Sequence, residues 1–360
     1  MTARVASDLG EFADDWNGLA LRSASPFLTR EWLSSWWSAF GRGEPTWILV
    51  SGANGSLRAG ALLEAGARSL VAAAANVHSG DWDAVARDTD AGIELWDALA
   101  ALGASRIRLN AMPAHAEGAR LAAAALQRAG YRLVRVSRDS PWVALPSSWD
   151  DLLAGVSKGL RSQFRRRRHA LEREAPLVFR TETGSRAVGE DLDAFLKLEA
   201  AGWKGRAGTA ILSDSRTERL YREFAASAAE AGWFRMRSLE LGGELIAAEY
   251  GCTFGGGGFL IKTTFNEGYA SFSPGLVLRG EVLKACIDEG LRFYDFLGGP
   301  DEYKRRWTSE LRPRVTLWAY RGAALPGYVY RARLRPALRA RGGPALKRVL
   351  QRAKRPSARQ

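Results

Sequence analysis

The sequence predicts an α/β (α+β) protein built from two halves, each a mixed, largely antiparallel sheet flanked by helices. Short apolar segments typical of strands alternate along the chain with amphipathic segments typical of helices. In the second half, three consecutive strand segments precede a helix and a further strand, an order that gives a mixed sheet. Neither a G-x-G-x-x-G nor a P-loop motif occurs, which argues against a Rossmann or P-loop nucleotide-binding sheet.

Length and composition fit two domains of ordinary size. The chain has 360 residues, of which 46% are hydrophobic, so a largely disordered protein is excluded. Only two cysteines occur, Cys252 and Cys286, which excludes a disulfide framework and a cysteine-based zinc site, and no metal is expected. The first residues lack a signal-peptide pattern and no apolar run is long enough to span a bilayer, so a cytoplasmic protein is expected.

Most of the excess positive charge lies at the C-terminus. The chain has 52 Lys+Arg against 39 Asp+Glu, and 11 of the basic residues, with no acidic one, fall between residues 331 and 360. The remainder is nearly neutral, which argues against nucleic acid as a partner. We expect residues 323–360 to form a basic tail that is either disordered or an amphipathic helix around Leu346, Val349 and Leu350. Such a helix would make a peripheral contact with anionic lipid.

The first predicted half comprises residues 1–150. Thr29 is the expected N-cap of a helix whose apolar residues recur at helical spacing. Asn54-Gly55 is a hairpin turn signal between two strand-like runs. The expected elements of this half are a helix through Phe40, strands at 47–50, 57–63 and 107–109, a helix at 119–129, and strands at 131–136 and 142–145.

The second predicted half comprises residues 151–322. It opens with a basic helix at 157–174, with Arg165 to Arg168 at its centre. The further expected elements are a strand at 177–183, helices at 191–201 and 216–231, strands at 234–241, 245–254 and 259–265, a helix from Pro274 to about 289, a strand at 292–297, a short helix at 301–308 and a strand at 315–320.

Several motifs carry a family resemblance. In chain order they are Pro26-Phe27, Glu31-Trp32, Trp36-Trp37, Ser157-Lys158-Gly159-Leu160-Arg161-Ser162, Trp203-Lys204-Gly205, Ser273-Pro274-Gly275-Leu276, Asp295-Phe296-Leu297-Gly298-Gly299 and Tyr303-Lys304-Arg305-Arg306-Trp307. Together they resemble the BioF2-like acetyltransferase domain family, a CelD-like group of the GCN5-related N-acetyltransferase (GNAT) superfamily that is related to FemAB. The resemblance implies two tandem acyl-CoA N-acyltransferase-like halves, with the working site in the second.

The resemblance implies a GNAT-type acyltransferase that moves an acetyl or acyl group from acyl-CoA to an amine or hydroxyl. The acceptor would be a small molecule or a glycan in polysaccharide or cell-envelope biosynthesis. Two alternatives remain open. One is a FemAB-type transferase that uses aminoacyl-tRNA. The other is a non-catalytic accessory protein of a polysaccharide-synthesis complex, which the incomplete glycine signature at residues 273–276 favours.

Acyl transfer requires a bound donor, a stabilised oxyanion and removal of a proton. The segment Ser273-Pro274-Gly275-Leu276 opens a predicted helix, and the resemblance places the pyrophosphate of acyl-CoA there. A helix N-terminus favours anions through its unpaired amide groups and its dipole. Proline in the first turn loses no needed hydrogen bond, and glycine lets a phosphate approach the backbone.

Ionisable residues within or next to apolar strands are the candidates for chemistry. Asp295 and Glu249 are candidate general bases, although each could instead be a structural carboxylate. Tyr303 is a candidate proton donor to the leaving thiolate, and its spacing predicts that it shares a helix face with Trp307. Candidate substrate-binding residues are Trp203, Lys204, Lys262, Lys304 and Trp307.

Two further segments allow either a structural or a functional interpretation. The arginine helix between Arg161 and Arg173 is either a solvated face or a binding surface for a phosphate-rich partner. The polar loop from Asn76 to Asp81 holds His78, a weak base candidate because the sequence shows no partner for it.

Overall fold

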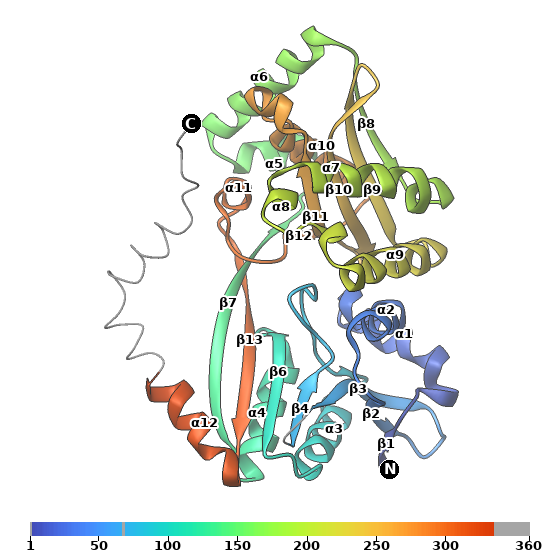
Figure 1. Ribbon diagram of the computed structural model, residues 1–360, viewed down its shortest axis with the longest axis vertical. Coiled ribbons are helices and arrows are strands. Elements are labelled where there is room, and N and C mark those ends of the chain that lie inside the picture. Colours follow the sequence, from blue (N-terminus) through green and yellow to red (C-terminus); the bar gives the residue numbers. More distant parts are fainter. Residues whose placement is uncertain (1, 67–68, 335–360) are drawn as a thin grey trace.

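The computed structural model describes residues 2–66 and 69–334, and one 13-stranded sheet runs through both halves (Figure 1). Its strands, in spatial order, are β1 (Thr2–Ala6), β2 (Pro45–Ser51), β3 (Leu57–Gly66), β4 (Leu70–Ala73), β6 (Arg106–Pro113), β13 (Leu311–Tyr320), β7 (Arg132–Ala144), β12 (Phe293–Asp295), β11 (Gly257–Phe265), β10 (Glu244–Phe254), β9 (Phe234–Leu241) and β8 (Leu177–Glu182), with β5 (Val85–Ala86) paired to β3. Only β4–β6 and β11–β12 are parallel among the described pairs. The predicted mixed, largely antiparallel architecture is confirmed.

Helices cover both faces of the sheet. The first part of the chain contributes α1 (Ala13–Arg22), α2 (Arg30–Phe40), α3 (Thr89–Ala101) and α4 (Glu117–Arg128). The second contributes α5 (Trp149–Gly155), α6 (Lys158–Glu174), α7 (Leu192–Ala201), α8 (Trp203–Arg206), α9 (Ser215–Glu230), α10 (Pro274–Asp288), α11 (Glu302–Arg305) and α12 (Leu325–Val329). In the second part, one core lies beneath α6 and α10, and another lies beneath α7 and α9 on the opposite face.

Local signals placed several elements correctly. Thr29 Oγ1 accepts a hydrogen bond from Trp32 N at 3.3 Å, which confirms Thr29 as the N-cap of α2. Strands β2 and β3 form the predicted hairpin, with Gly55 at φ +79° in the turn. Glycine adopts this left-handed conformation without the steric cost that a side chain would add.

One long strand replaces two predicted short ones. The sequence predicts strands at 131–136 and 142–145, but β7 is continuous from Arg132 to Ala144. Its middle, 135–139, is exposed and polar except for Val136, so no hydrophobic pattern marks it. Backbone pairing with β13 along ten residues holds it extended regardless of side-chain polarity.

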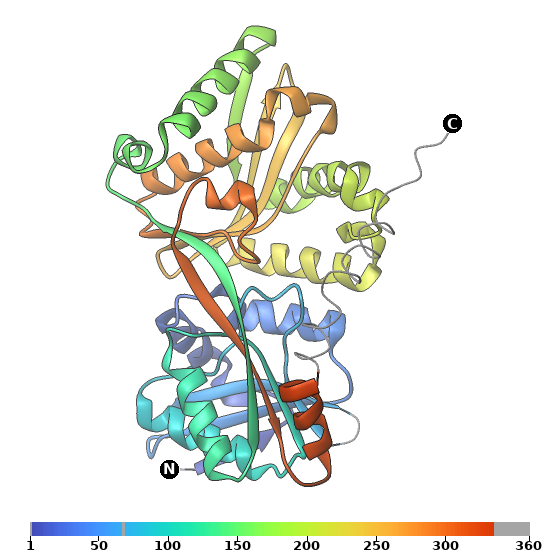
Figure 2. The same ribbon diagram turned by 90° about the vertical axis from the view of Figure 1, so that its left-hand side faces the viewer.

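The last strand of the sequence lies among the strands of the first half. β13 pairs with β6 on one side and with β7 on the other. It begins at Leu311, four residues before the predicted start at 315. Both views show β7 and β13 running together between the two parts of the molecule (Figures 1 and 2). This strand pair therefore joins the halves.

Aromatic packing also joins the halves. The ring of Trp32 on α2 lies edge-on to that of Phe224 on α9, with centroids 4.8 Å apart. Phe27 packs edge-on against Phe259 of β11 at 6.5 Å. Residues of α1, α2, α7 and α9 belong to a single buried cluster, so the two halves share a core.

The predicted basic tail is described only in part. Helix α12 and the turn Tyr330–Leu334 follow β13, where Arg331 Nε donates to Tyr320 Oη at 2.8 Å. The predicted amphipathic segment around Leu346, Val349 and Leu350 lies outside the described residues.

Candidate functional site

Strand β11 is paired with β12 at its start and continues beyond the end of β12. Gly257 to Phe259 pair in parallel with β12, and the last pair is Phe259–Asp295. Immediately beyond it, the register between β10 and β11 shifts, which leaves Ile261 as the extra residue of a β-bulge. A bulge bends its strand and redirects the side chains that follow. From Leu260 onward, β11 is therefore not paired with β12 within the described residues.

The open edge of β11 needs other partners for its backbone groups. Within the part of the chain that the structure describes, the β11–β12 ladder has only the three pairs before the bulge. One edge carbonyl is satisfied by a side chain, because Lys204 Nζ donates to Thr263 O at 2.9 Å. Unpaired backbone groups at such an edge are suited to hydrogen bonding with a ligand.

A cluster of ionisable side chains lies beside this edge, on the face covered by α7 and α9. Glu199 is 1% exposed and accepts hydrogen bonds from Lys204 Nζ at 2.7 Å and Ile211 N at 2.8 Å. Lys262 Nζ lies 5.4 Å from the centroid of the Tyr221 ring. Burial lowers the pKa of Lys262, and the charge of Glu199 opposes this shift. The candidates Lys204 and Lys262 thus meet at one place.

His78 joins this cluster from the first half. Its Nδ1 lies 3.2 Å from Tyr221 Oη and its Nε2 lies 3.4 Å from Thr217 Oγ1, while its ring stacks on Phe40 at 5.4 Å. Burial, followed by the positive charge of Lys262, lowers the pKa of His78 to about 4, so the imidazole is neutral at neutral pH. The sequence showed no partner for His78 because Tyr221 and Thr217 lie about 140 positions away in the chain.

The N-terminus of α10 lies at the far end of the open edge. Ser273 precedes the helix with φ +53°, and its side chain makes no capping hydrogen bond. The nearest atom to a Cβ added at Gly275 is Phe265 Cδ1, 3.8 Å away, so the first turn is uncrowded beside the end of β11. Leu276 is half-buried and packs against the core beneath α10. The predicted donor segment therefore adjoins the end of β11.

Tyr303 differs in burial from Lys304 and Trp307, although the sequence predicts that they lie together at the short helix α11. Trp307 is buried and its ring lies 6.3 Å from that of Phe164. Lys304 is buried too, and its Nζ donates to Leu297 O at 2.9 Å and pairs with Asp301 at 3.0 Å. Tyr303 is 44% exposed. Because α11 ends at Arg305, Trp307 reaches the core while Tyr303 remains accessible.

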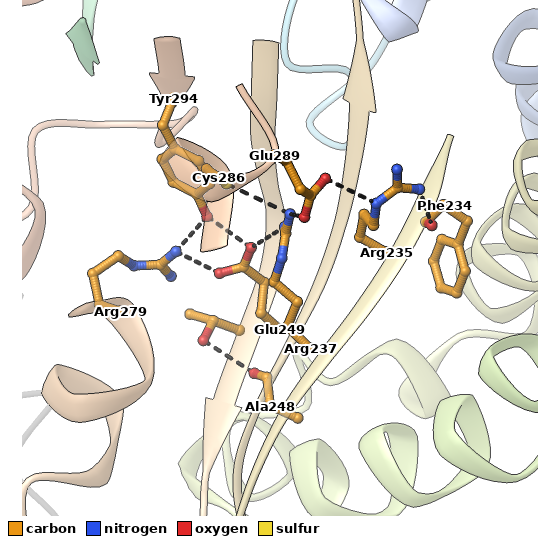
Figure 3. A network of polar contacts seen from close by, with 10 residues as sticks. Phe234, Arg235, Arg237, Ala248, Glu249, Arg279, Cys286, Glu289 and Tyr294 are labelled. Carbon is orange, nitrogen blue, oxygen red and sulfur yellow. Dashed lines mark hydrogen bonds and ion pairs between the residues drawn. The ribbon is translucent and has the colours of Figure 1, made fainter. Parts of the chain in front are cut away.

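Glu249 lies in a closed ionic network inside the sheet (Figure 3). The residue is fully buried. Its Oε1 accepts from Tyr294 Oη at 2.7 Å and pairs with Arg237 Nη1 at 3.4 Å, while its Oε2 pairs with Arg279. Arg237 is also within 3.4 Å of Glu289. Both carboxylate oxygens are occupied and Glu249 is not part of the lining of the cavity between the halves, so this geometry favours a structural role for Glu249 over that of a general base.

We expect Glu249→Gln to destabilise the fold. The change leaves two buried guanidinium groups without their shared carboxylate, so the free energy of unfolding should fall by about 3 kcal/mol, measured by urea denaturation. The matched control is Glu218→Gln, which removes a surface partner of Arg222 and should cost less than about 1 kcal/mol. Loss of turnover at wild-type stability would instead identify Glu249 as a catalytic base.

Asp295 faces a different part of the molecule. Its Oδ2 pairs with Arg314 Nη2 at 2.8 Å, and its Oδ1 accepts from Leu297 N at 2.8 Å and Ser140 Oγ at 3.4 Å. It lines a cavity of about 600 Å³ that residues of both halves enclose. The other charged or titratable residues of the lining are Arg22, Asp81, Asp83, Arg87, Asp88, His115, Glu117, Arg312 and Arg314.

Asp83 is a buried acid in the same cavity, and no sequence pattern singled it out. It is 8% exposed, and its Oδ1 accepts from Ala84 N at 2.8 Å. Its carboxyl group lies against the first turn of α4, where a Cβ added at Gly118 would be 2.0 Å from Oδ1. Burial raises the pKa of Asp83 to about 8, although the hydrogen bond from Ala84 N opposes the shift.

Asp83→Asn should change how stability depends on pH. The folded-state pKa of Asp83 lies above that of an unfolded aspartate, so wild-type stability from this group is fully present below about pH 4 and is lost as pH rises to about 8. The neutral asparagine variant does not lose stability in this way as pH rises. Its unfolding free energy should exceed that of wild type by a few kcal/mol at about pH 9 and by much less at about pH 5.

The matched control for that titration is Asp97→Asn on α3 of the same half, since Asp97 is an exposed partner of Arg128. Its difference from wild type should not grow between the two pH values. If Asp83→Asn behaved in the same way as Asp97→Asn, the buried acid would not have a raised pKa.

The remaining candidates lie at the surface. Trp203 is 57% exposed at the start of α8, and its backbone N donates to Glu267 Oε1 at 2.7 Å. In the arginine helix α6, Arg168 Nε pairs with Glu281 on α10 at 2.8 Å. Arg167 donates to Ser271 O at 2.5 Å, so two of its arginines attach α6 to the segment around α10.

The described residues contain neither a metal-binding cluster nor a membrane-spanning helix. Residues 2–66 and 69–334 contain no group of three or more His, Cys, Asp or Glu side chains placed to hold a metal ion. None of the helices within these residues has both the length and the apolar character needed to cross a membrane.

Comparison with known protein families finds a match in the second half of the chain. Residues 158–305 match the family model described as an acetyltransferase (GNAT) domain. The matched segment begins with α6 and ends with α11, so it contains the bulged strand β11, the N-terminus of α10 and Tyr303. This segment of the chain is therefore similar to a GNAT-type acetyltransferase domain.

Solved structures share the overall fold. FemX is 13% identical, with a TM-score of 0.63 over 92% of this chain and 100% of its own. The C-terminal DUF2156 domain of an Agrobacterium fabrum protein assigned as a lysylphosphatidylglycerol synthetase is 14% identical, with a TM-score of 0.57 over 90% and 97%. L-PGS from Bacillus licheniformis is 14% identical, with a TM-score of 0.50 over 84% and 95%. No curated protein matches the sequence.

Proposed function

We propose that this protein is an acyltransferase that moves an acetyl or longer acyl group from acyl-CoA to an amine or hydroxyl acceptor. The observation that carries the proposal is the bulge at Ile261, directly after the last β11–β12 pair and within the segment that matches a GNAT domain. From this point to its end at Phe265, β11 has β10 as a paired strand on one side and, within the described residues, no paired strand on the other. A thioester can lie along such an edge as an added strand does.

The residues around the edge suit the needs of a thioester donor. Backbone N–H groups on the open edge of β11 would stabilise the oxyanion that forms when the acceptor attacks the thioester carbonyl. The N-terminus of α10, at Pro274 and Gly275, would hold the pyrophosphate through its amide groups and dipole. The absent side chain at Gly275 leaves room for a phosphate there.

The positions of Tyr303 and Asp295 suggest a role in proton transfer for each. Tyr303 would donate a proton to the leaving CoA thiolate, because it is accessible and desolvation raises its pKa, which keeps its hydroxyl protonated. Asp295 is the proposed base for the acceptor. It belongs to the last strand pair before the opening and faces the cavity between the halves.

The cluster of Lys204, Lys262 and His78 would line the acceptor side of the edge. Its charges would orient a polar acceptor, and exposed Trp203 would cover part of it. The BioF2-like and CelD-like resemblance supports a polysaccharide or cell-envelope precursor as the acceptor. Lys304 and Trp307, which are buried, would act by fixing the position of α11.

Donor binding tests the proposal. Isothermal titration with acetyl-CoA and longer acyl-CoAs should detect binding, and Gly275→Asp should weaken it about tenfold or more by placing a negative charge beside the pyrophosphate. Gly159→Asp is the matched control, because Gly159 is also the second residue of a helix and should leave binding unchanged. Absence of binding by every acyl-CoA at millimolar concentration would reject the donor and favour an accessory role.

The same titration separates the FemAB-type alternative. Binding of aminoacyl-tRNA with a steep salt dependence, together with no binding of acyl-CoA, would replace the proposed donor.

Tyr303→Phe tests the proposed proton donor. With acyl-CoA and a functional acceptor, kcat should fall about a hundredfold while the dissociation constant for acyl-CoA stays near that of wild type. Tyr328→Phe on α12 removes a phenol outside the matched domain and should retain full turnover. Wild-type kcat in Tyr303→Phe would remove this residue from the chemistry.

A further inference from the structure

The cavity between the halves holds one buried acid that lacks a charged partner. Its neighbour Asp81 accepts a hydrogen bond from Ser25 Oγ and lies 3.6 Å from Arg314. Asp83, in contrast, receives its hydrogen bond from the backbone N–H of the next residue. In the described part of the chain, Asp83 takes part in no ion pair, although it is more than nine-tenths buried and lines the cavity.

Two of the four arginines that line the cavity, Arg312 and Arg314, are held by other groups. Arg314 bridges Asp295, at 2.8 Å, and Asp81, at 3.6 Å. The guanidinium carbon of Arg312 lies 3.6 Å from the centroid of the Trp142 ring and 4.6 Å from that of Phe293. Guanidinium groups stacked in this way are held by the rings. Arg22 and Arg87 also line the cavity, but within the described residues no arginine or lysine forms an ion pair with Asp83.

A buried carboxyl group without a partner is costly in its charged form. A ligand cation that entered the cavity would provide the missing partner. A primary ammonium group suits the position, since it is compact and presents three donors to an acid. The cavity volume of about 600 Å³ is typical of a small-molecule site, and Trp96 and Phe259 add apolar surface to its wall.

We propose that this cavity binds a small molecule with a primary ammonium group, which donates hydrogen bonds to Asp83 while the rest of the ligand contacts Trp96 and Phe259. The inference does not depend on acyl transfer. It concerns a cavity whose lining comes mainly from the first half and from β12 and β13, and it is tested without any acyl donor.

Matched pairs of small ligands test the proposal. Ethanolamine and cyclohexylamine are compared with their neutral counterparts ethylene glycol and cyclohexanol by ligand-observed NMR and isothermal titration on the full chain. At least one amine should bind, and its neutral counterpart should bind about tenfold more weakly or not at all, because a charged hydrogen bond is lost. Equal binding within both pairs, or no binding of either amine, would overturn the proposal.

Asp83→Asn identifies the residue. The variant keeps the shape of the side chain but removes its charge, so amine affinity should fall about tenfold or more. Asp97→Asn, the exposed control, should bind as wild type does. Unchanged affinity in folded Asp83→Asn, with folding checked by circular dichroism, would overturn the assignment.

Proton release provides a second readout on the wild-type protein. Near neutral pH, an ammonium ligand that pairs with Asp83 should displace its proton, because the carboxyl group is protonated in the empty cavity. The heat of amine binding should then vary with the ionisation enthalpy of the buffer. Heats that are independent of the buffer would contradict the pairing, whether or not the variant folds.

Discussion

The backbone ladder between β7 and β13 is the constraint on which the rest of the structure depends. It runs from Leu311 to Tyr320 and places the last strand of the chain between two strands of the first half. The same β7 pairs with β12 in the second half. Because one strand is shared in this way, the two halves cannot separate without breaking the sheet.

This connection also determines what lies at the junction. Arg314 enters the junction from β13 and reaches Asp295 of β12 and Asp81 of the first half. The three charges are buried and partly satisfied by one another, which leaves Asp83 as the unbalanced group in the same cavity. Charged side chains therefore line the cavity because one strand of the second half lies between strands of the first.

The two faces of the bulged region have different chemistry. Beneath α10, Glu249 and its arginines form a closed network that keeps β9, β10 and α10 in register. On the opposite face, Lys262 and Lys204 meet Glu199 next to the open edge of β11. In the proposed reaction, the ion pairs on one face would hold the sheet in place while the open edge on the other side bound the donor.

The class of fold and the positions of most elements could be predicted from the amino-acid sequence. Local chemistry sufficed there: a capping threonine at 29, an Asn-Gly turn, and apolar periodicity in the helices. It also identified Ser273 to Leu276 as a helix start, since Pro and Gly act through the backbone alone. It did not reveal the continuous β7, because the polar stretch in its middle is held by pairing and not by burial.

Only the tertiary structure decided what the charged residues do. Glu249 and Asp295 look alike in sequence, as acids within apolar strands, but one is enclosed by two arginines and the other lines a cavity. His78 has hydrogen-bond partners because segments far apart in the chain meet. Asp83 has no ion-pair partner among the described residues for the same reason. Strand alternation fixes which face a side chain takes, whereas its neighbours on that face depend on how the whole sheet is assembled.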